Sequence, residues 1–262
     1  MTRTFRAELI KLRRRRVAIA MTVSALAFAV IATTLVFLSA TSAGAPGAQR
    51  GATVESLGQA GGATEAFSIG VSFVGILVLV LFIANVAGEF SQGTFRTLLM
   101  RQPRRVGLLA GKMAALLVLA AIALALAEVM TVVASTAIAP SQDVATSSWF
   151  GVDALGEATS NYATALFGVA AWASLGMALA IFVRSIPVAL AIGIVWSGPF
   201  EHLLQDAWTA ASQWFPGLLL EALAAGGTAE VSSGRALTLV TLYVAAAVSA
   251  AAIVFARRDV TS

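Results

Sequence analysis

Few residues of this chain carry the chemistry that catalysis or metal binding requires. Cysteine is absent and His202 is the only histidine, which excludes disulfides, thiolate nucleophiles and Cys-type zinc sites. Glu201 and Asp206 lie close to His202, but one histidine without further ligands makes a poor metal site. The sequence also contains no GxSxG motif and no candidate catalytic triad. We therefore expect no metal and no catalytic residue, which argues against an enzyme.

The charge that the chain does carry is concentrated in residues 88–113, between two long apolar runs. This stretch reads GEFSQGTFRTLLMRQPRRVGLLAGKM. Within it, Phe95, Leu98 and Leu99 recur at the spacing of one helical face, and Pro103 ends the pattern. Because basic residues surround this apolar face, the pattern predicts a short amphipathic helix on the membrane surface.

The end of the same stretch, GLLAGKM, is only superficially similar to a phosphate-binding loop. Three residues rather than four separate its glycines, and Met113 stands where Ser or Thr must hold magnesium. We interpret Lys112 instead as an interfacial anchor of the apolar run that follows. The rest of the chain has no room for a nucleotide-binding domain, so any use of ATP requires a second polypeptide.

Composition places the chain in a membrane. Of its 262 residues, 59% are apolar and 11% are charged, whereas soluble domains carry about a quarter charged residues. The mean hydropathy is +0.89. Runs of about 20 apolar residues predict spanning helices. We expect an all-α polytopic membrane protein with a single transmembrane domain, residues 1–262, and six spans at 17–40, 66–88, 113–139, 162–183, 186–207 and 236–256.

The distribution of basic residues predicts the orientation. Fifteen of the seventeen Lys and Arg residues precede the first span, follow the last one, or lie after the second and fourth spans. Only Arg50 and Arg235 fall on the other side. Because Lys and Arg are enriched on the cytoplasmic side, we expect both termini in the cytoplasm. Topology therefore accounts for the isoelectric point of about 10.3, and we expect no nucleic-acid partner.

Residues 1–16 are predicted to form an amphipathic helix at the membrane surface. Its apolar stripe and flanking basic residues include Phe5, Leu9, Leu12, Arg13 and Arg16. Attraction to anionic lipid, about 1 kcal/mol for each basic residue, is the simpler explanation of the arginines. A cleaved signal peptide is the alternative interpretation of the first span. Its apolar run of 24 residues is longer than that of such signals, which favours a retained helix.

Glu128 is the one ionisable residue deep within a predicted span. A charge there costs about 2.5–3.5 kcal/mol on insertion scales. Small residues share its helical face, which places it against protein or a cavity rather than lipid. Two interpretations stay open, a contact for substrate or a proton and a structural hydrogen bond to a neighbouring helix. Asn85, near the end of the second span, is expected to form a helix–helix hydrogen bond, with a substrate contact as the alternative.

The fifth span is expected to be broken at its outer end, where Gly198 and Pro199 precede Glu201. Residues 208–230 keep a helical period that Pro216 interrupts, and their tryptophans suit a membrane–water boundary. This pattern predicts a re-entrant pair of short helices in the outer leaflet, with a plain surface helix as the alternative.

Two stretches give the chain a resemblance to a known family. The pattern E-x3-GT-x3-LL-x2-P-x-R-x6-K is nearly matched by Glu89, Gly93, Thr94, Leu98, Leu99, Pro103, Arg105 and Lys112. Only the spacing between Leu99 and Pro103 departs from it. The line AELIKLRRRR precedes the first span in the same way as in that family. Together with the six-span layout, these stretches resemble the permease subunits of the type-2 ABC exporter family.

The resemblance implies a function for the charged stretch. In that family the first cytoplasmic loop is a coupling helix that docks on a separate ATP-binding subunit, which assigns residues 89–105 to coupling. The residues assigned are Glu89, Gly93, Thr94, Phe95, Leu98, Leu99, Arg101, Pro103 and Arg105. The N-terminal helix is expected to contact the same subunit. By this resemblance the chain forms half of the translocation pathway of an ATP-driven exporter in a bacterial cell membrane.

The expected partners follow from the same resemblance. They are two copies of an ATP-binding cassette subunit, a second permease copy or a homologue, and membrane lipids. The chain itself is expected to hold no cofactor, because ATP and Mg²⁺ would bind the partner subunit. The alternative function is a secondary transporter or channel with ion coupling through Glu128, which predicts activity without ATP.

Overall fold

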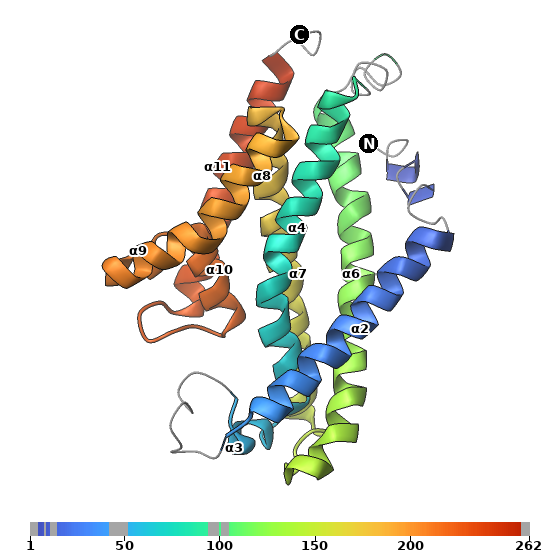
Figure 1. Cartoon of the computed structure of the whole chain (residues 1–262), viewed down its shortest axis with the longest axis vertical. Helices are drawn as coiled ribbons and strands as arrows, with labels where there is room; N and C mark the ends of the chain where they lie inside the picture. The colour runs from blue at the N-terminus through green and yellow to red at the C-terminus, as the bar shows by residue number, and fades with distance from the viewer. Residues whose placement is uncertain are drawn as a thin grey trace. The chain divides into compact units, whose positions relative to one another are not determined.

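The computed structural model describes residues 5–7, 9–10, 15–41, 52–93, 100 and 105–257. Throughout these ranges the chain is helical and contains no strand beyond two isolated bridges (Figure 1). The long helices are α2 (Arg15–Ser39), α4 (Glu65–Ser91), α6 (Arg105–Ile138), α7 (Val152–Val183) and α11 (Ser233–Arg257). The shorter α-helices of the described ranges are α3 (Val54–Leu57), α8 (Ile186–Val195), α9 (Glu201–Ala207) and α10 (Pro216–Ala224).

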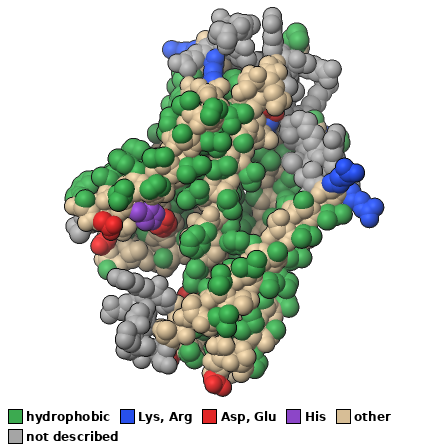
Figure 2. All heavy atoms as spheres, viewed as in Figure 1, with side chains coloured by type: hydrophobic (Ala, Val, Ile, Leu, Met, Phe, Trp, Pro, Cys, Tyr) green, Lys and Arg blue, Asp and Glu red, His purple; other side chains and the backbone are tan. Residues whose placement is uncertain are grey.

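Six helical segments are long and apolar enough to cross a membrane, which confirms the predicted all-α polytopic fold. They are Ala18–Ser39, Gly62–Ser91, Val106–Gln142, Val152–Val183, Ile186–Ala207 and Ser233–Arg257. Hydrophobic side chains cover the sides of these helices and charged side chains are sparse among them (Figure 2). The chain is therefore a multi-pass membrane protein, because such helices satisfy their own backbone groups in hydrocarbon.

Two helices are longer than the sequence predicted. The third long helix begins at Arg105 rather than at Met113, and the fourth begins at Val152 rather than at Tyr162. Hydropathy locates only the apolar part of a helix, whereas helical hydrogen bonding continues through polar residues beyond it. The early start of α6 places Lys112 two turns inside a helix.

The contacts of the chain group into two compact units, and α4, α6 and α7 contribute residues to both. Unit 2 comprises Leu12–Ser72 and Leu119–Leu166. Its buried cluster contains Phe37, Leu57, Ala66 and Trp149. The Trp149 indole donates a hydrogen bond to the carbonyl of Leu57 at 2.9 Å, which joins the turn before α7 to the segment before α4. A Cβ at Gly62 would overlap the Leu57 carbonyl, so this segment requires glycine there.

Unit 1 comprises Met1–Lys11, Phe73–Val118 and Phe167–Ser262. Within it α4 and α7 pack at short distance, because a Cβ added to Gly176 would lie 2.8 Å from the carbonyl oxygen of Leu79. Small residues allow such close helix packing in membranes, where no hydrophobic force draws helices together. The unit therefore holds the second half of α4 firmly against α7.

The fifth spanning segment changes its helical geometry at the predicted interruption. After α8, Trp196–Phe200 form a π-helical turn, η3, that contains Pro199, and α9 follows directly. A π turn accommodates the missing N–H of proline, and such turns are often found at functional sites. A 3-10 turn, η4 (Thr209–Gln213), then leads to α10, which packs against α11. The stretch between the fifth and sixth spans therefore contains short helical elements, η4 and α10, as the helical period of residues 208–230 predicted.

Candidate functional site

The candidate functional site lies where α4 ends, inside unit 1. We call it the α4 junction and define it by Glu89, Phe90, Lys112, Arg184 and Phe255. Glu89 and Phe90 belong to the last turn of α4, and the other three residues come from α6, the α7–α8 turn and α11. The end of one helix is therefore attached to three other parts of the chain.

The first attachment is an ion pair between the Lys112 ammonium and the Glu89 carboxylate. The side chains are 3% and 16% exposed, so both charges are largely removed from solvent. Removing one partner of a buried pair leaves an uncompensated charge and costs about 3–5 kcal/mol. The structure thus differs from the sequence interpretation of Lys112, which is a buried partner of Glu89 rather than an interfacial anchor. The signal that could have indicated this pair is the presence of opposite charges at the facing ends of two consecutive spans.

The second attachment comes from the turn between α7 and α8. The Arg184 guanidinium lies over the Phe90 ring, 5.2 Å from its centroid. Arg184 has φ 55°, a left-handed conformation that commonly ends a helix, and its N–H donates to the carbonyl of Ala180 at 2.9 Å. Cation–π contacts contribute about 0.5–2 kcal/mol depending on exposure. Sequence reasoning used Arg184 only as a marker of topology and missed this contact.

The third attachment is aromatic. The rings of Phe90 and Phe255 meet edge to face, with centroids 6.0 Å apart and an interplanar angle of 84°. Phe255 is fully buried in the last turns of α11. Edge-to-face pairs contribute about 0.5–1.5 kcal/mol beyond the area they bury. The sequence offered no signal for this pair, because phenylalanine is common throughout apolar helices.

The α4 junction connects the end of α4 to α6, to the α7–α8 turn and to α11. Among the described residues there is no group of three or more His, Asp or Glu side chains that could hold a metal ion. The ion pair joins the two helices that flank residues 92–104. A force on that segment therefore reaches α4 and α6 together, and through Phe90 it reaches the α7–α8 turn and α11.

The predicted coupling residues are only partly described. Glu89 belongs to the α4 junction, and Gly93 follows the end of α4 with φ +67°, a conformation that favours glycine. Thr94, Phe95, Leu98, Leu99, Arg101 and Pro103 lie outside the described residues. Arg105 is the first residue of α6, and its side chain is not described. The predicted amphipathic ridge therefore stays a prediction.

The predicted interfacial helix is described only in pieces. Phe5 and Leu9 are helical and half-buried, whereas Leu12 and Arg13 lie outside the described residues. Arg16 is exposed in the first turn of α2. These observations agree with helix at the start of the chain and leave its place at a membrane surface as a prediction.

Glu128 is half-buried on α6, within unit 2. The same face of α6 buries Leu124, Thr131 and Ser135, as its small and polar residues predicted. One Glu128 carboxyl oxygen is buried and has no hydrogen-bond partner among the described residues. This oxygen makes no hydrogen bond to a neighbouring helix within the described residues, and both interpretations of Glu128 stay predictions.

The Asn85 side chain is exposed on α4 and has no hydrogen bond to another side chain or backbone group among the described residues. It continues an exposed stripe at four-residue spacing, formed by Phe73, Leu77 and Leu81. Among the residues that the structure describes, no neighbouring helix supplies the predicted hydrogen bond, which stays a prediction. An amide group in hydrocarbon is costly unless it has a hydrogen-bond partner.

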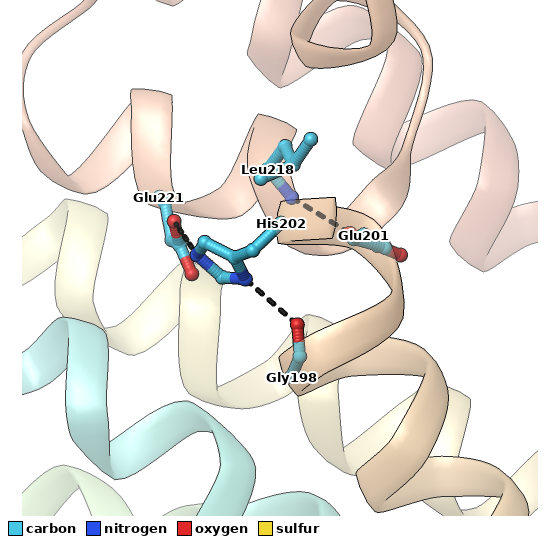
Figure 3. Close-up of polar contacts among 5 residues, drawn as sticks. All are labelled: Gly198, Glu201, His202, Leu218 and Glu221. Carbon is cyan, nitrogen blue, oxygen red and sulfur yellow. Dashed lines mark hydrogen bonds and ion pairs between the residues drawn. The ribbon is translucent and has the colours of Figure 1, made fainter. Parts of the chain in front are cut away.

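Glu201, His202 and Asp206 do not converge on one point. The Glu201 carboxylate accepts a hydrogen bond from the N–H of Leu218, and His202 contacts Glu221 (Figure 3). Asp206 is exposed near the end of α9. Two neighbouring residues of α9 thus contact α10, which the search for metal ligands in the sequence did not anticipate.

Comparison with curated proteins finds no match to this chain. One family model matches residues 16–261, which include all six candidate spans and every residue of the α4 junction. The match therefore covers the membrane-spanning part of the molecule. The chain belongs to the family described as a protein of unknown function, DUF2705.

Proposed function

We propose that the chain is the membrane-spanning subunit of an ATP-driven ABC exporter and forms half of its translocation pathway. The observation that carries the proposal is the buried Glu89–Lys112 pair at the base of residues 92–104. This segment holds the pattern that resembles the coupling loop of type-2 ABC permeases. An external motor that displaces the segment would act on two spanning helices through one rigid base.

The ion pair supports coupling better than it supports topology alone. Positive charge on one side of the membrane is sufficient for orientation, and exposed arginines provide it without any partner. Burying Lys112 with Glu89 instead costs desolvation, which close pairing offsets. A pair of this kind resists separation of α4 and α6, so the helices move as one. Rigid transmission of this type is what a transporter driven by a separate ATPase requires.

The proposed site of action is a bacterial cell membrane, with both termini in the cytoplasm. The distribution of Lys and Arg supports this orientation, because fifteen of seventeen fall on one side of the six spans. The α4 junction would then lie at the cytoplasmic ends of α4 and α11, where an ATP-binding subunit can reach residues 92–104. ATP and Mg²⁺ would bind that subunit.

A second permease copy, or a homologue, is the other proposed partner. The exposed stripe of Phe73, Leu77, Leu81 and Asn85 supports this proposal. Three of its side chains suit lipid equally well, but the Asn85 amide does not. A neighbouring helix that offers a hydrogen-bond acceptor would satisfy it. Two copies would then enclose the pathway.

The absence of cysteine from the sequence makes a direct test possible. We would introduce Phe95→Cys or Leu98→Cys and co-express the chain with a candidate ATP-binding cassette subunit from the same organism. We expect a crosslink between the two proteins. In a second set of variants the cysteine is placed by Arg96→Cys, and adding Phe95→Asp or Leu98→Asp should abolish the crosslink. An exposed cysteine at Phe73 serves as the matched control. Full-rate flux through vesicles that contain this chain alone, without nucleotide, would contradict the proposal.

The second candidate function is a secondary transporter or channel that uses Glu128. It is favoured by the buried carboxyl oxygen that has no partner among the described residues. Glu128→Gln separates the two candidates, because it removes the titrating group and keeps the shape of the side chain. Loss of an ATP-independent flux supports the second candidate. Retained ATP-dependent transport in the same variant leaves the first in place.

A further inference from the structure

The short helices α9 and α10 are joined by two consecutive residues of α9. Glu201 contacts the N-terminal turn of α10 through Leu218, and His202 contacts Glu221 one turn further along the same helix (Figure 3). All of these residues belong to unit 1. We call this arrangement the α9–α10 corner. Its two contacts differ in burial and in the chemistry that maintains them.

The Glu201 contact is a helix cap supplied from another helix. The first N–H groups of a helix have no partner within it, and α10 has no side-chain cap of its own. Glu201 is fully buried, and its Oε2 accepts a hydrogen bond from the Leu218 N–H at 3.0 Å. A Cβ at Gly217 would overlap this carboxylate, so glycine is needed for the approach. This contact fixes the start of α10 against α9.

The His202 contact requires an additional proton. Its Nδ1 lies 2.7 Å from the carbonyl oxygen of Gly198, which only accepts, so Nδ1 must carry hydrogen. Its Nε2 lies 3.2 Å from Oε2 of Glu221, and a carboxylate also only accepts. A neutral imidazole cannot donate from both nitrogens. One proton beyond those of a neutral histidine and a carboxylate must therefore lie between Nε2 and Oε2.

We propose that His202 and Glu221 form a proton-binding site that closes the α9–α10 corner, while Glu201 holds the corner at its base. With the proton bound, the side chains attract and α9 stays against α10. Without it, the Nε2 lone pair faces a carboxylate and the contact becomes repulsive. The corner would then pivot about the Glu201–Leu218 contact. This inference concerns the structure of the corner and does not rest on the proposed function.

Glu201 and Glu221 are the ionisable groups that act on the charge of His202 among the described elements that pack against α9, and only Glu221 contacts the imidazole ring. The turns η3 and η4 contain no ionisable side chain, and Glu221 is the only one in α10. On α9 itself, Glu201 faces Leu218 and Asp206 lies one turn beyond His202. On α11, Arg235 lies over the ring of Trp214, 5.6 Å from its centroid. The proton is therefore assigned to His202 and Glu221.

The contact is weak enough to be reversible. The side chains of His202 and Glu221 are 49% and 40% exposed. Exposed ion pairs change an equilibrium only modestly, so loss of the proton should raise the open population about two- to fivefold. The buried cap at Glu201 prevents complete separation of the helices.

The first test uses the fact that His202 is the only histidine of the chain. Nitrogen NMR of the full-length protein in nanodiscs, labelled with ¹⁵N in histidine alone, reports both ring nitrogens without assignment. At acid pH both nitrogens should carry hydrogen. After deprotonation the remaining hydrogen should lie on Nδ1, because the Gly198 carbonyl holds it there. A neutral ring with its hydrogen on Nε2 would overturn the proposal.

The second test measures the corner itself. Spin labels at Ala207→Cys and Ala225→Cys are attached to the only cysteines of the protein, at exposed positions beyond both contacts. The longer-distance population should rise about two- to fivefold between pH 5 and pH 8.5. His202→Gln and Glu221→Gln should abolish this response, whereas the control Asp206→Asn should keep it. A wild-type distribution that does not change with pH, or variants that respond like the wild type, would overturn the proposal.

Discussion

The α4 junction and the α9–α10 corner are each maintained by an ion pair, and the two pairs differ mainly in burial. Lys112 and Glu89 are almost fully enclosed, whereas His202 and Glu221 are about half exposed. A buried pair is costly to break, while an exposed pair contributes at most about 1 kcal/mol. The same interaction can therefore act as a permanent connection in one region and as a reversible contact in another.

The largest expected effect tests the permanence of the α4 junction. Lys112→Ala leaves the Glu89 carboxylate buried without its partner and should lower the free energy of unfolding by about 3–5 kcal/mol. Thermal unfolding in detergent measures this loss. The exposed Arg257→Ala is the matched control and should change stability by less than about 0.5 kcal/mol.

A double substitution sharpens this test. Replacing both members, with Glu89→Leu and Lys112→Met, removes the charges together and should restore most of the stability, because apolar replacements of buried pairs are often neutral. The same variant should lose ATP-dependent transport if coupling requires the pair. Equal stability of Lys112→Ala and wild type would show that the pair is not a structural connection.

The next effect concerns the cap of α10. Glu201→Ala leaves the Leu218 N–H without its acceptor and should cost about 1–3 kcal/mol. Glu201→Gln keeps an acceptor oxygen and should cost less. Hydrogen exchange of the first turn of α10 measures the local loss. If exchange there is the same in Glu201→Ala and in the wild type, the cap does not hold this helix.

A smaller effect is expected at the aromatic part of the α4 junction. Phe90→Leu removes the edge-to-face contact with Phe255 and the ring beneath Arg184, and should cost about 1–2 kcal/mol. Phe73→Leu, on an α4 side chain that is 70% exposed, is the control and should be close to neutral in detergent. Thermal unfolding of both variants measures these losses of stability. Equal losses in Phe90→Leu and Phe73→Leu would contradict a special role for Phe90.

The smallest effect distinguishes the two ion pairs directly. His202→Gln should reduce stability by about 1 kcal/mol or less. The loss should be present at acid pH, where the wild-type site holds its proton, and should vanish as pH rises and that proton is released. The stability that the α4 junction variants lose should not change over the same pH range. A pH-independent effect of His202→Gln would assign it a purely steric role.

Part of the site could be predicted from sequence. Glu89 and Lys112 both fell in the coupling pattern, and their opposite charges at the ends of consecutive spans were visible. Phe90, Arg184 and Phe255 could not be found in this way, because their contacts join residues that are far apart in the chain. The contact of Glu201 could not be found either, because its partner is a backbone N–H, which every residue except proline has.

The sequence by itself determined six apolar helices and the absence of thiol chemistry. It could do so because a backbone in hydrocarbon must satisfy its hydrogen bonds within each segment, so each span depends on its own run of residues. Only the tertiary structure decided that Lys112 is buried against Glu89 and that Glu201 caps α10. Those outcomes depend on which helix faces meet, and helix packing in membranes follows from close contact and polar pairing between segments rather than from hydropathy.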